Sequence, residues 1–153
     1  MFVSLPGLDP QSGLLPEGEH RASWDEIVGM FSWNQRRRQL LDGLIDGLTI
    51  LAESGCRQVW LNGSFVTSKD EPGDFDCVWD TDGVDLRILK VLCPEILELD
   101  GHRLSQKLRF GGEFLPNIVE SSSGRKFSDF FSNRPNGNCK RNCASTSRKG
   151  FQQ

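Results

Sequence analysis

Residues 59–80 read VWLNGSFVTSKDEPGDFDCVWD, and the predicted fold is built around this stretch. An apolar run ends in a Gly-Ser pair at 63–64, and a second run opens after nine further residues with Asp-Phe-Asp at 74–76. The first run, and the alternation of acidic and apolar residues in the second, are typical of short buried strands, predicted over 58–61 and 74–79. A Pro-Gly pair in the polar segment between them favours a tight turn. These two neighbouring strands form the centre of the predicted domain.

Helical patterns precede the two strands. Residues 23–26 read Ser-Trp-Asp-Glu, which fits a capping box at the start of a short amphipathic helix. A stripe of leucines then predicts a second helix over 34–54, ended by Gly55. The predicted fold is α+β, a small mixed β-sheet that carries the Gly-Ser and Asp-x-Asp residues, with the helices of residues 23–54 packed on it. Residues 1–22 are rich in Pro and Gly and are predicted to form an irregular N-terminal arm that lies against the body.

The patterns after residue 80 are shorter. An apolar run predicts a short buried helix over 84–92, and alternating residues predict a third strand over 107–115. The domain is predicted to cover 23–132, with a short amphipathic segment at its end. From 133 to 153 Asn, Arg, Lys, Ser and Gly dominate and no apolar period is visible, so this tail is predicted to be disordered or loosely attached.

The acidic pair Asp74 and Asp76 is the pattern that points to chemistry. Residues i and i+2 of a strand share a face, so the two carboxylates project side by side. They repel each other unless a positive charge lies between them or one takes up a proton. A hard divalent cation such as Mg²⁺ or Mn²⁺ binds such oxygens and leaves coordination positions open for water and phosphates. The pattern therefore predicts a metal site, while Phe75 and Cys77 face the other way and anchor the strand in the core.

The residues around the Gly-Ser pair suit a phosphate. Gly63 has no side chain and would let a triphosphate approach the backbone closely, and Ser64 offers its hydroxyl and its N–H. Residues 65–67 are predicted to form a helical turn, whose N-terminus adds partial positive charge. Lys69 in the following loop could reach a β- or γ-phosphate as a point charge, although a solvated loop lysine is the alternative.

Each of these signals also has a structural explanation. An Asp-x-Asp after Pro-Gly can be an exposed hairpin edge, because Asp favours turns. Apolar neighbours make both strands look buried instead, and carboxylates on buried strands need a partner. The three arginines at 36–38 are interpreted as the solvated face of the second helix. The cysteines at 56, 77 and 93 are interpreted as small buried hydrophobes, and the C-x3-C at 139–143 lacks the further ligands of a zinc site.

Composition limits the classes of partner. A net charge of −3 does not support a general polyanion-binding surface, so a nucleic acid would have to dock on a local patch. No apolar stretch reaches the roughly eighteen residues that a membrane span needs. The N-terminus lacks the basic start and long apolar run of a secretory signal. The cysteine pattern favours a reducing, cytoplasmic setting.

The arrangement of strand, Gly-Ser, spacer and Asp-x-Asp resembles the DNA polymerase β-like nucleotidyltransferase superfamily, especially its small bacterial minimal nucleotidyltransferase members. A narrower resemblance covers most of the chain up to about residue 137. It rests on the segments LLPEGEHRASWDEI, LLDGLIDGLTILAESGC, VWLNGSFVTSKDEPGDFDCVWD and KLRFGGEF, which resemble an uncharacterised bacterial domain family placed in that superfamily.

The resemblance implies a reaction as well as a site. The reaction is metal-dependent transfer of a nucleoside monophosphate from a nucleoside triphosphate to a hydroxyl of a protein, an RNA or a small molecule. Asp74 and Asp76 would bind magnesium, and Gly63 and Ser64 would contact the triphosphate. By analogy a protein partner of the toxin–antitoxin or phage-defence type is expected. The alternative is a non-catalytic domain of the same fold that binds a nucleotide or a partner protein.

The resemblance also implies a third carboxylate from a later strand, which completes the metal site and can act as general base. Glu113, on the predicted third strand, is the first choice, and Glu120 and Asp80 are alternatives. Asp85 follows Asp76 by only nine residues, too few to form the next strand of the same sheet.

The end of the chain departs from the narrower family, whose members tend to continue past the Phe-Phe segment into another apolar, strand-like stretch. Here the sequence stays polar to its last residue. We interpret this as a C-terminal truncation or a shifted reading frame after about Gly137. A degenerate family member is therefore a further alternative.

Overall fold

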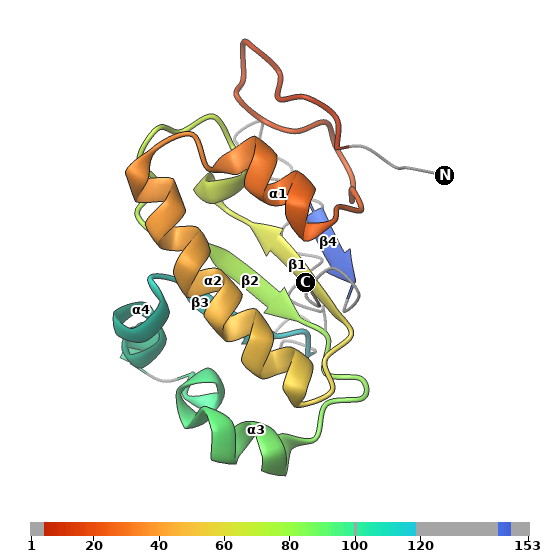
Figure 1. Cartoon of the computed structure of the whole chain (residues 1–153), viewed down its shortest axis with the longest axis vertical. Coiled ribbons are helices and arrows are strands. Elements are labelled where there is room, and N and C mark those ends of the chain that lie inside the picture. The colour runs from red at the N-terminus through yellow and green to blue at the C-terminus, as the bar shows by residue number, and fades with distance from the viewer. Residues whose placement is uncertain (1–4, 100, 119–143, 148–153) are drawn as a thin grey trace.

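The fold is α+β, with a small mixed sheet and helices packed on it (Figure 1). The computed structural model describes residues 5–99, 101–118 and 144–147. Strand β1 is antiparallel to both β2 and β4, whereas β2 and β3 are parallel. Within the described residues the sheet has the order β3-β2-β1-β4, formed by β1 (Gln58–Asn62), β2 (Asp76–Trp79), β3 (Glu113–Pro116) and β4 (Ala144–Ser147). The predicted fold class is confirmed.

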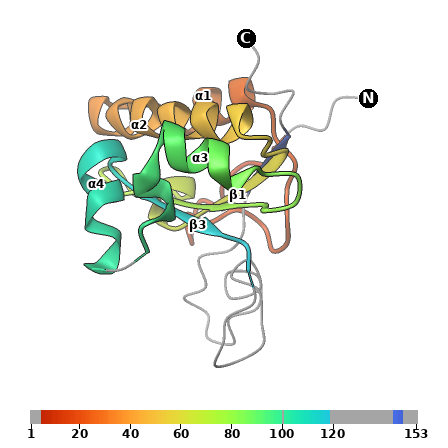
Figure 2. The ribbon, with the colours of Figure 1, turned by 90° about the horizontal axis from the view of Figure 1, so that it is seen from below.

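Helices α1 (Trp24–Phe31) and α2 (Gln35–Glu53) lie together on one side of the sheet (Figure 2). Ser23 begins α1 with the predicted capping box, in which its hydroxyl accepts from the backbone of Glu26 and the Glu26 carboxylate accepts from the backbone of Ser23. Asn34 begins α2, whose leucines are buried along one stripe. The two predicted helices are confirmed. None of the described helices is long and apolar enough to cross a membrane.

Alternation along the strands gives the sheet two different faces. Cys77 and Trp79 of β2 belong to the hydrophobic core, together with Phe114 of β3 and the leucines of α2. Because successive side chains of a strand point to opposite faces, Asp76 and Val78 lie on the face turned away from α1 and α2. The acidic residues of β2 therefore stand on the side of the sheet opposite the two long helices.

The predicted third strand over 107–115 is two elements. Helix α4 (Leu104–Phe110) comes first, and β3 begins at Glu113. Gly111 separates them, because its φ of +84° ends the helix in the left-handed region that favours glycine. Apolar residues at 108, 110 and 114 are compatible with a strand and with a helix boundary alike, and period alone does not distinguish the two over so short a run.

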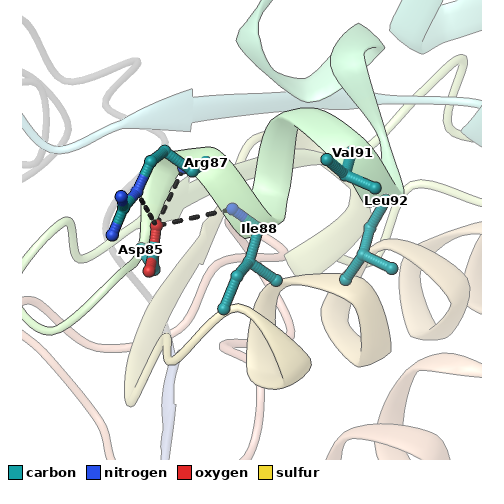
Figure 3. Close-up of a pocket in the computed structure, with 5 residues that line it drawn as sticks. All are labelled: Asp85, Arg87, Ile88, Val91 and Leu92. Carbon is teal, nitrogen blue, oxygen red and sulfur yellow. Dashed lines mark hydrogen bonds and ion pairs between the residues drawn. The ribbon is translucent and has the colours of Figure 1, made fainter.

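A helix is present within the predicted range 84–92, as α3 (Leu86–Leu92), but it is not buried. Leu89 alone among its residues is buried. Figure 3 shows Ile88, Val91 and Leu92 lining a pocket at the surface of this helix. Two short 3-10 segments, η2 (Pro94–Leu97) and η3 (Gly101–Arg103), follow α3 and precede α4.

The N-terminal arm is irregular and lies against the body, as predicted: Leu5 and Leu15 are buried in the core. In the polar tail, residues 144–147 were expected to be disordered but form β4, paired with β1. The backbone groups of an edge strand supply its hydrogen bonds, so pairing needs no apolar alternation that a sequence pattern would reveal. The predictions for 126–132 and for the rest of the tail lie outside the described residues.

Candidate metal centre

Three carboxylates converge where β2 and β3 begin. Asp76 and Glu113 open these parallel strands and are register partners, so their side chains share a face. Asp74 lies two residues earlier, in the segment that leads into β2 and that had been predicted as part of it. Each residue offers one oxygen, and the three oxygens lie within 4.8 Å of one another. The structure thus brings the predicted pair together with the first-choice third acid.

Two cations hold Glu113 in place. Arg103 Nε lies 3.2 Å from Oε2 of Glu113, and Lys107 Nζ lies 3.0 Å from Oε1. Glu113 is only 9% exposed, so these ion pairs compensate a carboxylate that has lost most of its water. Neither cation was predicted from the sequence, because Lys107 was assigned to a strand and no pattern placed Arg103 beside it. Arg103 precedes α4 with a left-handed φ of 59°, so its approach to Glu113 beside Lys107 depends on a backbone kink that helical spacing does not reveal.

Gly63 lies directly against the carboxylate of Asp76. Its φ of +80° lies in the region that favours glycine, and a Cβ built on it would stand 2.3 Å from Oδ2 of Asp76. Ser64 then opens the short 3-10 turn η1 (Ser64–Val66), one residue earlier than the turn predicted at 65–67. The Thr67 hydroxyl donates to the carbonyl oxygen of Ser64 at 2.6 Å and closes this turn. The Gly-Ser pair is thereby positioned at the acidic cluster by backbone geometry.

Asn62, the last residue of β1, extends the row of polar side chains. It is the register partner of Asp76, so Asn62, Asp76 and Glu113 form one row across three strands. The Asn62 side chain is 0% exposed, and neither Nδ2 nor Oδ1 has a hydrogen-bond partner in the described part of the chain. A buried amide without partners is costly and calls for a water or a ligand. Asn62 was not predicted as a site residue, although an amide at the end of an otherwise apolar strand, directly before Gly-Ser, could have indicated it.

Arg37 of α2 fixes the loop that joins β1 to β2. The interpretation of residues 36–38 as a solvated face is wrong for Arg37, which is 0% exposed. Its guanidinium donates to the carbonyl oxygens of Phe31, Phe65, Thr67 and Lys69. Burial lowers the pKa of Arg37 to about 10, which leaves it charged at neutral pH. A run of three arginines does not show which one meets a cluster of carbonyls, because that cluster exists only in the folded loop.

The remaining candidates lie elsewhere. The Lys69 side chain is exposed, and its backbone carbonyl is one of the loop oxygens that accept from Arg37 of α2. Asp80 follows the last residue of β2, at the opposite end of the strand from Asp76. Asp85 is the N-cap of α3, where it accepts hydrogen bonds from two backbone N–H groups (Figure 3). Glu120 lies outside the described residues.

The cysteines of the described residues are structural. Cys56, Cys77 and Cys93 are free and buried, which confirms the interpretation of these three as small hydrophobes. Burial raises the pKa of the Cys56 thiol to about 11 and raises that of Cys77 well above its usual value. The pair at 139–143 lies outside the described residues.

The donor set of the acidic cluster suits a hard divalent cation. Octahedral Mg²⁺ at about 2.1 Å from each oxygen places neighbouring ligands about 3 Å apart and opposite ligands about 4.2 Å apart. The three oxygens lie within 4.8 Å of one another, which is close to this range of separations. Asp74, Asp76 and Glu113 could therefore hold a metal ion.

Comparisons with known proteins add the family. Neither the curated proteins nor the solved structures include a match to this sequence. Residues 6–153 match the model of a family of unknown function, DUF6932. This match extends over nearly the whole sequence, and the chain therefore belongs to the DUF6932 family of unknown function.

Proposed function

We propose that this protein is a metal-dependent nucleotidyltransferase, which transfers a nucleoside monophosphate from a nucleoside triphosphate to the hydroxyl of an acceptor. The observation that carries the proposal is the convergence of Asp74, Asp76 and Glu113 beside Gly63. The resemblance of the Gly-Ser and Asp-x-Asp arrangement to the DNA polymerase β-like superfamily supports the same reaction. The acceptor is a protein, an RNA or a small molecule.

Each residue of the site has a distinct role in the proposed reaction. A Mg²⁺ or Mn²⁺ ion held by the carboxylates would neutralise phosphate charge and lower the pKa of the acceptor hydroxyl. Gly63 has no side chain, so its backbone packs directly against the Asp76 carboxylate, beside the place where a phosphate oxygen would enter. Ser64 supplies a hydroxyl and an N–H donor for that oxygen. Glu113 either completes the ligand set or accepts the proton of the attacking hydroxyl as general base.

Glu113 bears on both the proposal and its alternative. A domain that only binds a nucleotide needs no third carboxylate. The pairing of Glu113 with Asp76 across β2 and β3 therefore supports catalysis. The ion pairs of Glu113 with Arg103 and Lys107 favour the alternative, a non-catalytic domain that binds a nucleotide or a partner protein, because they occupy the carboxylate that catalysis needs. Catalysis thus requires Glu113 to be released.

Label transfer tests the proposal. The wild-type protein is incubated with each labelled nucleoside triphosphate, Mg²⁺ or Mn²⁺ and a cell lysate, next to a variant carrying Asp74→Asn and Asp76→Asn. Asn keeps the shape of Asp without its charge, so we expect transfer by the wild type, none by the double variant, and similar melting curves. Asp46→Asn, on the exposed side of α2, is the matched control and should transfer normally. Transfer that survives in the double variant would refute the assigned site.

A second readout separates the two functions. If no label is transferred but the wild type binds nucleoside triphosphates in a metal-dependent manner, the non-catalytic alternative is favoured. The same two Asp substitutions should then abolish the metal dependence of that binding.

A further inference from the structure

Arg103 and Lys107 approach the acidic cluster from one short segment. The guanidinium of Arg103 spans the Glu113 carboxylate, with Nε 3.2 Å from Oε2 and Nη2 3.4 Å from Oε1, while Lys107 Nζ lies 3.0 Å from Oε1. The Arg103 and Lys107 side chains are 28% and 38% exposed, against 12% for that of Glu113. Both cations are therefore more accessible to a ligand from solvent than the carboxylate they hold.

The backbone that delivers Arg103 is unusual. His102 and Arg103 have φ of 55° and 59°, the only positive values among non-glycine residues in the described ranges. A side chain makes this conformation costly, and residues that adopt it are frequent at functional sites. Arg103 is also the N-cap of α4 without forming a side-chain cap bond. Its side chain reaches Glu113 instead of stabilising its own helix.

The positive charges of Arg103 and Lys107 oppose the binding of a metal ion at Glu113 unless an anion binds as well. A divalent cation that takes Glu113 as a ligand would stand beside a guanidinium and an ammonium group, and repulsion opposes its binding. A triphosphate supplies the missing negative charge, and the planar fork of Arg fits phosphate oxygens. Asn62, fully buried and without hydrogen-bond partners in the described residues, lies in the same row as Asp76 and Glu113. This amide is independent evidence that a ligand completes the polar face.

We propose that Arg103 and Lys107 bind the triphosphate by exchanging partners. Without ligand they hold Glu113, and when metal and triphosphate bind, Glu113 turns to the metal while both cations take phosphate oxygens. The inference rests on the proposed function in one respect, that a metal and a triphosphate occupy this cluster, and it does not require that transfer takes place.

The exchange and a purely structural ion pair predict opposite changes in metal affinity when Arg103 is replaced. If Arg103 only holds Glu113 in place, its loss disorders a metal ligand and weakens metal binding. If Arg103 competes with the metal for Glu113, its loss leaves the binding of metal alone unchanged or tighter. Binding of a triphosphate must weaken at the same time, because a charged donor has been removed.

The first experiment compares Arg103→Gln with the wild-type protein. Binding of free Mn²⁺ is measured by electron paramagnetic resonance, and binding of the Mg²⁺ complex of inorganic tripolyphosphate by calorimetry, which avoids the unknown base. We expect tripolyphosphate affinity to fall about tenfold to a hundredfold, the loss typical of a charge-assisted hydrogen bond, with Mn²⁺ affinity equal or higher. Arg87→Gln, which removes an exposed charge on α3, is the matched control and should change neither.

Glu113→Gln provides the reciprocal experiment and does not depend on the folding of the Arg103 variant. Removing the carboxylate charge frees both cations, so tripolyphosphate without metal, measured with a chelator present, should bind more tightly than to the wild type. Mn²⁺ alone should bind more weakly. Unchanged affinity for metal-free tripolyphosphate in Glu113→Gln, or an Arg103→Gln variant that loses Mn²⁺ binding while keeping tripolyphosphate, would overturn the exchange.

These measurements also separate this inference from the proposed function. If the wild type transfers no label yet binds tripolyphosphate through Arg103, the phosphate site stands and the transferase proposal fails. If label is transferred but Arg103→Gln binds tripolyphosphate like the wild type, the exchange is refuted while the transferase proposal stands.

Discussion

Replacing Arg37 with Met is expected to destabilise the protein strongly, although Arg37 lies outside the acidic cluster. The buried guanidinium donates to four carbonyl oxygens, and three of them, from Phe65, Thr67 and Lys69, belong to the loop that follows Gly63. Met fills similar volume but leaves these carbonyls without their donor. The loop that positions the Gly-Ser pair should therefore loosen together with the fold.

The size of the effect follows from two opposing contributions. Each hydrogen bond from a charged donor contributes about 1.5–3 kcal/mol, but a simple sum overstates the gain because the guanidinium has lost its hydration. The lowered pKa of Arg37, about 10, reflects that loss. Removing one partner of a buried charged network costs about 3–5 kcal/mol. At roughly 3 °C per kcal/mol for a chain of this size, we expect the melting temperature to fall by about 10–15 °C.

Urea denaturation followed by circular dichroism measures this loss. Arg38→Met is the matched control, since Arg38 is the exposed neighbour on the same helix and, among the described residues, donates only to the carbonyl of Ser32. It should cost less than about 1 kcal/mol. An Arg37→Met variant that loses less than about 1 kcal/mol, or no more than Arg38→Met, would refute the reasoning that the carbonyls depend on this donor.

Three further predictions concern other close contacts. Gly43→Ala should destabilise by about 2–3 kcal/mol in urea, because a Cβ there would lie 1.7 Å from the backbone oxygen of Phe110 and would push α2 from α4. Gly63→Ala should cost about 1–2 kcal/mol for its φ of +80° and should also weaken Mn²⁺ binding, since the new methyl group displaces the carboxylate of Asp76. Cys77 should resist iodoacetamide at pH 8.5 in the folded protein, as followed by mass spectrometry, because burial raises the pKa of its thiol and the reactive thiolate is scarce.

Controls for these predictions come from the same chain. Gly29 lies in α1, where a Cβ would meet nothing within 4 Å, so Gly29→Ala should be neutral or stabilise by up to about 1 kcal/mol. If Gly43→Ala resembles Gly29→Ala, the close approach of α2 and α4 is not as described. Equal Mn²⁺ affinity in Gly63→Ala and wild type would contradict the prediction that a methyl group at this position displaces the Asp76 carboxylate. Cys77 in urea should react quickly, and equally rapid reaction without urea would contradict its burial.

The parts of the fold that the sequence predicted depend on local chemistry. The capping box at Ser23, the leucine stripe of α2 and the alternation around Asp76 each involve residues within a few positions of one another. Such local patterns indicate a helix or a strand without any information about tertiary packing. The side-by-side placement of Asp74 and Asp76 was likewise predicted from local spacing, although Asp74 precedes β2 in the structure.

Contacts between segments distant in the sequence could not be predicted in this way. Arg37 is buried because carbonyls some thirty positions away close around it, and β4 forms because the backbone of β1 has a free edge. Glu113 could only be nominated from the sequence, since its place beside Asp76 depends on a parallel register between β2 and β3. The ion pairs of Glu113 with Arg103 and Lys107 depend further on the backbone kink at Arg103, where α4 begins. Residue types and local periods specify which groups are present, whereas the register and packing of remote segments determine which of those groups meet.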